Sequence, residues 1–283
     1  MHTHVTKKRT HQEINVKLSQ SESKYAIQTD KDDISLPAVI VFSGSRGSGK
    51  TYSCIQLMRH FEKKRYITRT FLLCPTRESN DLYSNLKTLQ KKDCYDDENT
   101  FNTSLHTIID QVKRDWYEYE QEEEYRKIFF KAHRNHLSLD LKEQTTLEFR
   151  QGEPPKIVPK PSHLLIIDDA QGTGLYSNAR RDFLSHIIIK HRHIPITVTL
   201  LAQSWTGIPR VIRLNTTQFA VFKTGDKTQL KQIYDTFVNN VEFDKFERMY
   251  KEAVSKPHGF LFIDTVPKKE YKRFCSGFNH YLT

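Results

Sequence analysis

Short runs of apolar residues alternate along this chain with longer polar segments. Five runs have the composition of buried strands, at 38–44 (AVIVFSG), 69–75 (RTFLLCP), 163–170 (HLLIIDDA), 196–204 (ITVTLLAQS) and 218–225 (QFAVFKTG). Their apolar positions are nearly continuous rather than alternating with polar ones, which is typical of parallel strands covered on both faces. The pattern therefore predicts an α/β fold, with a mainly parallel central sheet flanked by helices.

A second kind of pattern appears near the C-terminus. Two apolar runs, 259–266 (GFLFIDTV) and 271–278 (YKRFCSGF), are separated only by the turn-forming residues PKKE. Such a short connection joins antiparallel strands. We therefore expect a C-terminal β-hairpin.

Two polar segments interrupt or precede this framework. Residues 1–36 have too few apolar positions to cover a core, so they predict a flexible arm ahead of a domain at 37–283, available to lie along DNA or another subunit. Residues 77–162 are highly charged, carry apolar residues at helical spacing and end in the Pro-rich link GEPPKIVPKPS. They predict a helical insert beside the sheet. Its charged face either is simply solvated, which we favour, or contacts DNA or a protein partner.

The charge of the chain narrows the choice of partners. Its 283 residues include 44 Lys and Arg against 34 Asp and Glu, a net charge of +10. A surplus of this kind suits a partner with regularly spaced negative charge, of which nucleic acid is the first candidate. The alternative is a basic protein with no such partner.

The cysteines and the hydropathy indicate the cellular setting. Four cysteines occur without CxxC spacing, which argues against a zinc cluster and a disulfide framework. The chain has no apolar run long enough to span a membrane, and its first residues lack the apolar core of a signal peptide. We expect an intracellular, soluble protein without a membrane partner.

One motif carries specific chemistry. The sequence GSRGSGKT at 44–51 matches G-x-x-x-x-G-K-[ST], the Walker A or phosphate-binding loop, and lies between a predicted strand and an amphipathic helix. Its glycines let backbone N–H groups surround an anion at the positive end of the helix dipole. Lys50 is expected to reach the β- and γ-phosphates, and Thr51 to bind Mg²⁺. The predicted ATP-binding residues are Gly44, Ser45, Arg46, Gly47, Ser48, Gly49, Lys50, Thr51 and Tyr52.

Two acids follow the strand at 163–170. Asp168 and Asp169 lie at its carboxyl end, where ligands bind in such folds. Asp168 is the expected Mg²⁺ residue of a Walker B motif. Asp169 is the expected general base or water-orienting group. Alone, two such acids form a turn or a helix cap more often, but the upstream loop favours the functional interpretation.

Two further elements complete the candidate site. Gln203 ends the strand at 196–204 and is a candidate sensor of the γ-phosphate, with satisfaction of loop backbone groups as the alternative. Arg192 precedes that strand and is the candidate arginine that a neighbouring subunit inserts to stabilise phosphoryl transfer. Arg180 and Arg181 are alternatives for this role, and a basic surface facing DNA or solvent is the competing interpretation.

Taken together, these motifs resemble a known class. GSRGSGKT, LLIIDDAQ, HRH ahead of ITVTLLAQS, and HGFLFIDT are similar to the motifs of FtsK–HerA P-loop motors, and within them of the genome-packaging ATPases of large DNA viruses and virophages, over about residues 37–280. The resemblance implies the roles given above for Lys50, Thr51, Asp168, Asp169, Gln203 and Arg192. The insert at 77–162 has no match in the pattern, and Asp169 stands where Glu is commoner.

The same resemblance implies an activity and its partners. It implies an oligomeric ring, a pentamer or hexamer, that hydrolyses ATP to translocate double-stranded DNA into a preformed capsid. A capsid or portal component is then a partner, and the site of action is a virus factory in the host cell and, transiently, the capsid. Basic stretches at 210–214, 223–231 and 267–273 are candidate phosphate contacts.

Other activities remain open at this stage. A helicase or another nucleic-acid-remodelling NTPase would act on single strands and use aromatic platforms. A nucleotide-dependent assembly switch would bind ATP without significant turnover, although it would not need the second acid. The sequence shows no lid or acceptor pocket of a small-molecule kinase.

Overall fold

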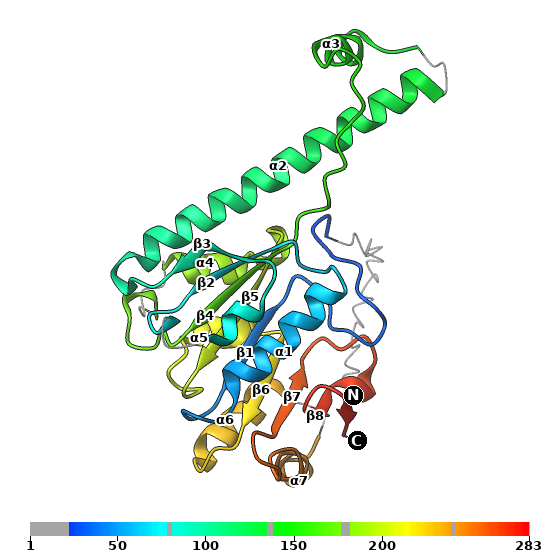
Figure 1. The fold of residues 1–283 in the computed structure, drawn as a ribbon. Coiled ribbons are helices and arrows are strands. Elements are labelled where there is room, and N and C mark those ends of the chain that lie inside the picture. The colour runs from blue at the N-terminus through cyan, green and yellow to red at the C-terminus, as the bar shows by residue number, and fades with distance from the viewer. Residues whose placement is uncertain (1–22, 78–80, 135–137, 177–181, 239–240, 283) are drawn as a thin grey trace, which may run out of the picture.

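The computed structural model describes residues 23–77, 81–134, 138–176, 182–238 and 241–282. Within these residues, one mixed sheet has the strand order β3-β2-β4-β5-β1-β6-β7-β8-β9 (Figure 1). Its strands are β1 Val39–Ser43, β2 Arg69–Leu73, β3 Leu89–Tyr95, β4 His163–Asp168, β5 Ile196–Ala202, β6 Gln218–Phe222, β7 Phe260–Asp264, β8 Phe274–Ser276 and β9 His280–Tyr281.

The predicted fold class is confirmed. The pairs from β3 to β6 are parallel, and β6–β7, β7–β8 and β8–β9 are antiparallel. The expected hairpin is present as β7 and β8, with Leu261 opposite Ser276 and Ile263 opposite Phe274. The short strand β9 extends it.

Helices cover both faces of the parallel strands, as the continuous apolar runs required. In β1, Val39 and Val41 point into one core, and Ile40 and Phe42 point into the other. On the second face α1, Lys50–Lys63, packs through Cys54, Met58 and Phe61, among others. The first face is covered by α4 Phe183–Ile189, α5 Arg210–Asn215, α6 Lys227–Phe237, α7 Phe243–Ala253 and the first half of α2.

The insert is only partly as predicted. It does contain two helices, α2 Phe101–Arg134 and α3 Leu141–Phe149, but it also contributes β3, which we did not expect. β3 is an edge strand with the polar sequence LQKKDCY, and its one buried residue is Asp93. The Arg69 guanidinium donates to both oxygens of Asp93, at 3.0 and 2.7 Å. Charged edge strands carry no apolar run, so the pattern at 89–95 did not indicate a strand.

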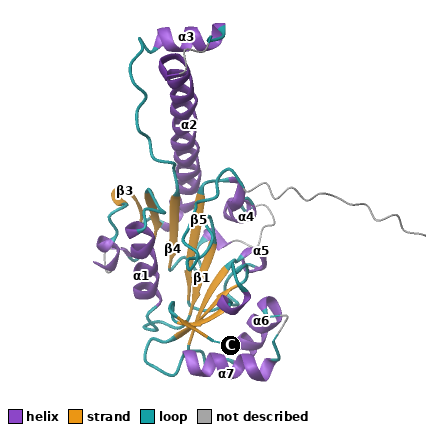
Figure 2. Ribbon diagram, turned by 90° about the vertical axis from the view of Figure 1, so that its right-hand side faces the viewer, coloured by secondary structure: helices purple, strands orange, loops and turns teal. Residues whose placement is uncertain are grey.

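The long helix α2 leaves the domain. Its first half packs on the sheet through Phe101, Leu105, Ile108 and Val112. Its 34 residues span about 51 Å at 1.5 Å per residue, so the second half extends past the sheet, with α3 at its tip (Figures 1 and 2). None of the described helices is both long and apolar enough to cross a membrane.

The N-terminal segment also differs from the flexible arm predicted for residues 1–36. Residues 1–22 lie outside the described residues, but 23–36 pack on the domain: Leu36 is buried, and Ile27 and Ile34 lie against the core. Three carboxylates of this segment pair with α1 and the hairpin, namely Asp30 with Lys64, Asp32 with Lys272 and Asp33 with His60.

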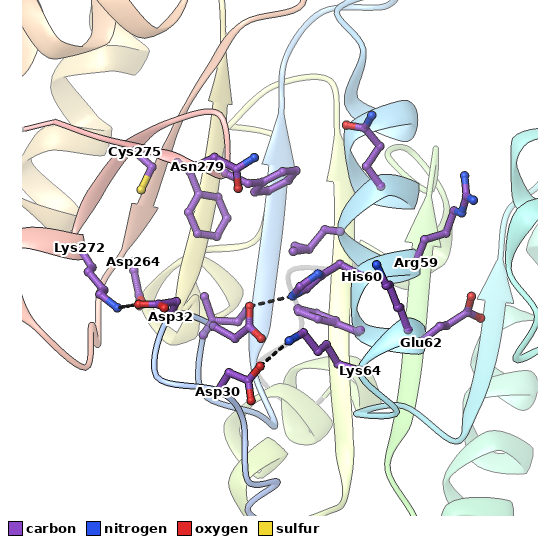
Figure 3. Close-up of a pocket in the computed structure, with 18 of the residues that line it drawn as sticks. Asp30, Asp32, Arg59, His60, Glu62, Lys64, Asp264, Lys272, Cys275 and Asn279 are labelled. Atoms are coloured by element: carbon purple, nitrogen blue, oxygen red, sulfur yellow. Dashed lines mark hydrogen bonds and ion pairs between the residues drawn. The ribbon is translucent and has the colours of Figure 1, made fainter.

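A cavity of 1090 Å³ lies between this segment, the second half of α1 and the hairpin (Figure 3). Its lining carries both signs of charge and also includes the aromatic residues Phe262 and Phe278. No residue of the GSRGSGKT loop lines it. The large cavity is therefore separate from the predicted phosphate site.

Candidate nucleotide-binding site

The GSRGSGKT loop joins β1 to α1, and its glycines are required by its shape. Gly49 has a φ of 98°, in the left-handed region, and a Cβ there would lie 3.1 Å from the His258 side chain. A Cβ on Gly44 would lie 2.6 Å from Cβ of Phe222 on β6. The loop is therefore folded tightly onto the ends of the neighbouring strands.

The loop presents a set of unused hydrogen-bond donors. The first turn of α1 contains no acidic residue. The backbone N–H groups of seven loop and helix residues donate no hydrogen bond to any described residue: Ser45, Arg46, Gly47, Gly49, Lys50, Thr51 and Tyr52. Free N–H groups at the start of a helix form an anion site, because they point at the ligand and the helix dipole favours negative charge. The loop therefore fits a phosphate chain.

Lys50 lies over this loop. Its Nζ donates to the carbonyl oxygens of Gly44 at 2.7 Å and Ser45 at 2.9 Å. Burial lowers the pKa of Lys50, and the nearby carboxylates of Asp168 and Asp169 oppose that effect. The ammonium is thus held beside the free N–H groups, with its charge supported by two acids.

Asp168 meets the loop from β4. The strand β5 lies between β1 and β4, with Ala202 opposite Ser43 on one side and Leu201 opposite Asp168 on the other. This register brings Thr51 within reach, and its Oγ1 donates to Oδ2 of Asp168 at 3.3 Å. Burial raises the pKa of Asp168, and hydrogen bonds from Tyr83 and Thr51 counteract the rise.

These two groups fit a magnesium ion only together with a nucleotide. A hydroxyl and a carboxylate oxygen are the ligand types that Mg²⁺ prefers. In the part of the chain that the structure describes, no cluster of three His, Cys, Asp or Glu side chains could hold a metal alone. The ion would therefore take its remaining ligands from phosphates and water.

Asp169 and Gln203 are also brought together. Gln203 Nε2 donates to Oδ1 of Asp169 at 3.1 Å, across the ends of β4 and β5. Asp169 has a φ of 54°, in the left-handed region that Asp tolerates better than most residues. Gln171 fixes the other side of this contact, because its Oε1 accepts from the Gln203 N–H at 2.8 Å and its Nε2 donates to the Ser204 carbonyl at 3.2 Å.

Arg192 lies elsewhere. It belongs to the short helical turn His191–His193 ahead of β5, whereas Gln203 follows the other end of that strand. A strand of this length spans about 23 Å. Arg192 therefore lies near the amino ends of the parallel strands, whereas the loop lies at their carboxyl ends. Its side chain is exposed, and its carbonyl accepts from Ser23 Oγ at 2.6 Å. Arg180 and Arg181 lie outside the described residues.

A second cavity, of 440 Å³, opens beside the loop. Its walls combine loop residues 45–48 with the 254–259 turn, and its charged lining residues are Arg46, Lys223 and Lys256. Among the residues that the structure describes, no carboxylate lines it. Such a lining attracts anions, which suits a nucleotide whose phosphates bind in the adjacent loop.

The sequence motifs did not identify two residues of this region. Gln171 follows the acid pair in the same LLIIDDAQ stretch, so its position in the sequence could have indicated that it belongs to the site. Tyr83 lies in the insert and donates a hydrogen bond to Asp168. No local motif indicated that contact, because 85 residues separate the two side chains.

Comparison with known proteins gives structural matches only. No protein-family model and no curated protein matches the chain. One similar structure is the genome packaging NTPase B204 of Sulfolobus turreted icosahedral virus 2 in complex with AMP, with 14% identity and a TM-score of 0.47, covering 82% of this chain and 94% of that one. Another is B204, the DNA-packaging ATPase of Sulfolobus turreted icosahedral virus, with 16% identity and a TM-score of 0.46, over 81% and 93% of the two chains.

A third match is EssC (ATPases 2 and 3) of Geobacillus thermodenitrificans, with 14% identity and a TM-score of 0.43, over 73% of this chain and 36% of that one. At these identities and TM-scores the activities of those proteins do not transfer to this chain. Viral genome-packaging ATPases, which the sequence motifs resemble, are thus among the solved structures similar to it.

Proposed function

We propose that this protein is a Mg²⁺-dependent ATPase that translocates double-stranded DNA and packages a viral genome into a preformed capsid. The observation that carries the ATPase part is the meeting of two distant segments at one edge of the sheet. The loop at 44–51 supplies free N–H groups and Lys50, and the ends of β4 and β5 supply Asp168, Asp169 and Gln203.

Each residue then has a defined task in hydrolysis. The N–H groups and Lys50 bind the phosphates. Thr51 and Asp168 would hold the magnesium ion, which would supply positive charge to the phosphates. Water attacks the γ-phosphorus, the bond to the bridging oxygen of ADP breaks, and Asp169 accepts the proton of the water before losing it to solvent. Gln203, which donates to Asp169, links this step to the end of β5.

The DNA part of the proposal is supported by the distribution of charge. Residues 77–162 contain 14 basic residues (Lys and Arg) and 17 acidic residues (Asp and Glu). The rest of the chain contains 30 basic and 17 acidic residues. The positive charge thus belongs to the ATPase domain rather than to the insert. Contacts to DNA phosphates need such charge but no sequence reading.

The structure shows which side chains of the basic stretches are available to contact DNA phosphates. Two lysines of 267–273 are engaged inside the chain, since Lys268 Nζ donates to Thr29 and Asp30 and Lys272 Nζ pairs with Asp32. Lys223 lines the cavity beside the phosphate loop. The exposed Arg210, at the start of α5, stays available for DNA.

Steady-state ATP hydrolysis tests the proposal. The rate is measured without DNA, with double-stranded DNA and with single-stranded DNA, each at low and at raised salt. We expect duplex DNA to stimulate hydrolysis and raised salt to remove the stimulation, because phosphate contacts release counterions. Stimulation by single strands alone would favour a remodelling NTPase, and nucleotide binding without turnover would favour an assembly switch.

The position of Arg192 gives a separate prediction. Because it lies at the sheet edge opposite its own loop, it can complete a nucleotide site only in a neighbouring subunit of a ring. Arg192→Ala and Lys50→Ala proteins should each be nearly inactive. Mixed in equal amounts they should regain activity, because about a quarter of the subunit junctions then pair an intact loop with an intact arginine.

The control for this mixing is Arg248→Ala, which removes an exposed arginine of α7. That protein should keep its activity alone. If the Arg192→Ala and Lys50→Ala mixture stays inactive while subunits are seen to exchange, Arg192 does not act between subunits.

A further inference from the structure

Tyr83 reaches the nucleotide site from the insert. It lies in η2, the short helical turn Asp81–Asn85 between β2 and β3, and only 2% of its surface is exposed. Its hydroxyl donates to Oδ2 of Asp168 at the end of β4. Neither the phosphate loop nor the acid pair requires this contact, so Tyr83 is an additional component of the site.

The contact fixes the orientation of the Asp168 carboxylate. The Thr51 hydroxyl donates to the same oxygen, Oδ2, at 3.3 Å. Oδ1 accepts no hydrogen bond from the described residues. Two protein hydroxyls thus hold one oxygen, and the other is left for a metal ion or its bound water.

Tyr83 is itself held in place by contacts of the first part of the insert, residues 82–88. The η2 turn is closed on itself, since the Leu86 N–H donates to the Tyr83 carbonyl at 3.1 Å and Asn85 Nδ2 donates to the Leu82 carbonyl at 2.9 Å. Just beyond it, Thr88 donates through its N–H, at 2.7 Å, and its hydroxyl, at 2.6 Å, to Glu62 of α1. These hydrogen bonds connect the segment that carries the phenol to α1.

We propose that Tyr83 is a positioning residue of the magnesium site, through which the insert sets the affinity for the metal ion. The proposal rests on the proposed function, since it concerns the ion that accompanies ATP. Groups that orient a metal-binding carboxylate commonly contribute 10- to 100-fold to metal affinity. Because coupling is reciprocal, a bound ion also stabilises the observed position of the η2 turn.

Tyr83→Phe tests the proposal, since it removes the hydroxyl and keeps the ring. Mn²⁺ serves as the probe, and its binding to the complex of the full chain with a non-hydrolysable ATP analogue is followed by electron paramagnetic resonance. We expect the dissociation constant for Mn²⁺ to rise about tenfold, while metal-free binding of the analogue is unchanged. Raising the Mg²⁺ concentration should restore ATP hydrolysis in the variant.

Tyr66→Phe is the matched control. Tyr66 is also buried, with 5% of its surface exposed, and its hydroxyl donates to Oδ2 of Asp33 at 2.8 Å, beyond the far end of α1. This variant should bind Mn²⁺ as the unaltered protein does. An equal loss of Mn²⁺ affinity in both variants would assign the effect to general packing and overturn the proposal.

Two other outcomes would also overturn the positioning role of Tyr83. They differ in whether the proposed ATPase function stands. If Tyr83→Phe binds Mn²⁺ as tightly as the unaltered protein, Tyr83 has no positioning role and the proposed function stands. If the unaltered protein binds neither the analogue nor Mn²⁺ with it, the proposed function fails together with the inference.

Discussion

Lys50→Ala is expected to lower the rate of ATP hydrolysis by about 100- to 1,000-fold, the usual cost of removing one preorganised donor from a site of developing negative charge. In the structure the Lys50 ammonium is held by the carbonyls of Gly44 and Ser45, beside free N–H groups. Alanine keeps the helix α1, whose packing depends on Cys54, Met58 and Phe61. The measurement is steady-state phosphate release, with the thermal unfolding midpoint recorded to show that the fold persists.

Lys63→Ala is the control for this experiment, because Lys63 is an exposed lysine of the same helix. Its rate should match that of the unaltered protein. Hydrolysis at the normal rate in Lys50→Ala would show that the loop does not bind the reacting phosphates, and the nucleotide site would have to be sought elsewhere.

Asp169→Asn is expected to lower the rate of hydrolysis by about 100- to 10,000-fold, the range for loss of a general base, and to leave ATP bound. Asparagine is nearly isosteric, can still accept the hydrogen bond from Gln203 and tolerates the φ of 54° at this position. What it removes is the carboxylate to which we assign the role of accepting a proton from water. Equilibrium binding of a fluorescent ATP analogue, alongside single-turnover hydrolysis, separates the two effects.

The comparison for Asp169→Asn is Asp235→Asn, which alters an exposed acid of α6 that pairs with Lys231. Turnover should be unaffected there. A rate within a few fold of normal in Asp169→Asn would mean that another group accepts the proton, and weak nucleotide binding in that variant would place Asp169 in binding rather than in the chemical step.

The sheet was predictable wherever burial shaped the sequence. β1, β4 and β5 are apolar at nearly every position because helices cover both of their faces, and the runs at 38–44, 163–170 and 196–204 showed this directly. β3 was missed, since its edge position calls for charged residues and its buried Asp93 is compensated by Arg69. Residues 23–36 were misjudged for a related reason: they are held by Ile27, Ile34 and a few ion pairs, too few contacts to form a pattern.

The candidate site, too, was only partly predictable from the sequence. The loop at 44–51 and the acids at the end of β4 could be predicted, because each is defined by a short run of consecutive residues. The contacts of Tyr83 with Asp168 and of Gln203 with Asp169 join segments that only the strand order brings together. Arg192 precedes β5, whereas Gln203 follows it, so the direction of β5 places the two residues at opposite ends of the strand.

The projecting helix α2 has a mechanical consequence. It is anchored at its base through Phe101, Leu105 and Val112, and it follows β3, which directly succeeds the η2 turn. The part of α2 beyond Val112 runs from 113 to 134, about 33 Å, and a tilt of about 10° of that part moves its tip by about 6 Å. A small change in the tilt of this part near the sheet is therefore magnified at α3, which lies at the tip of the helix.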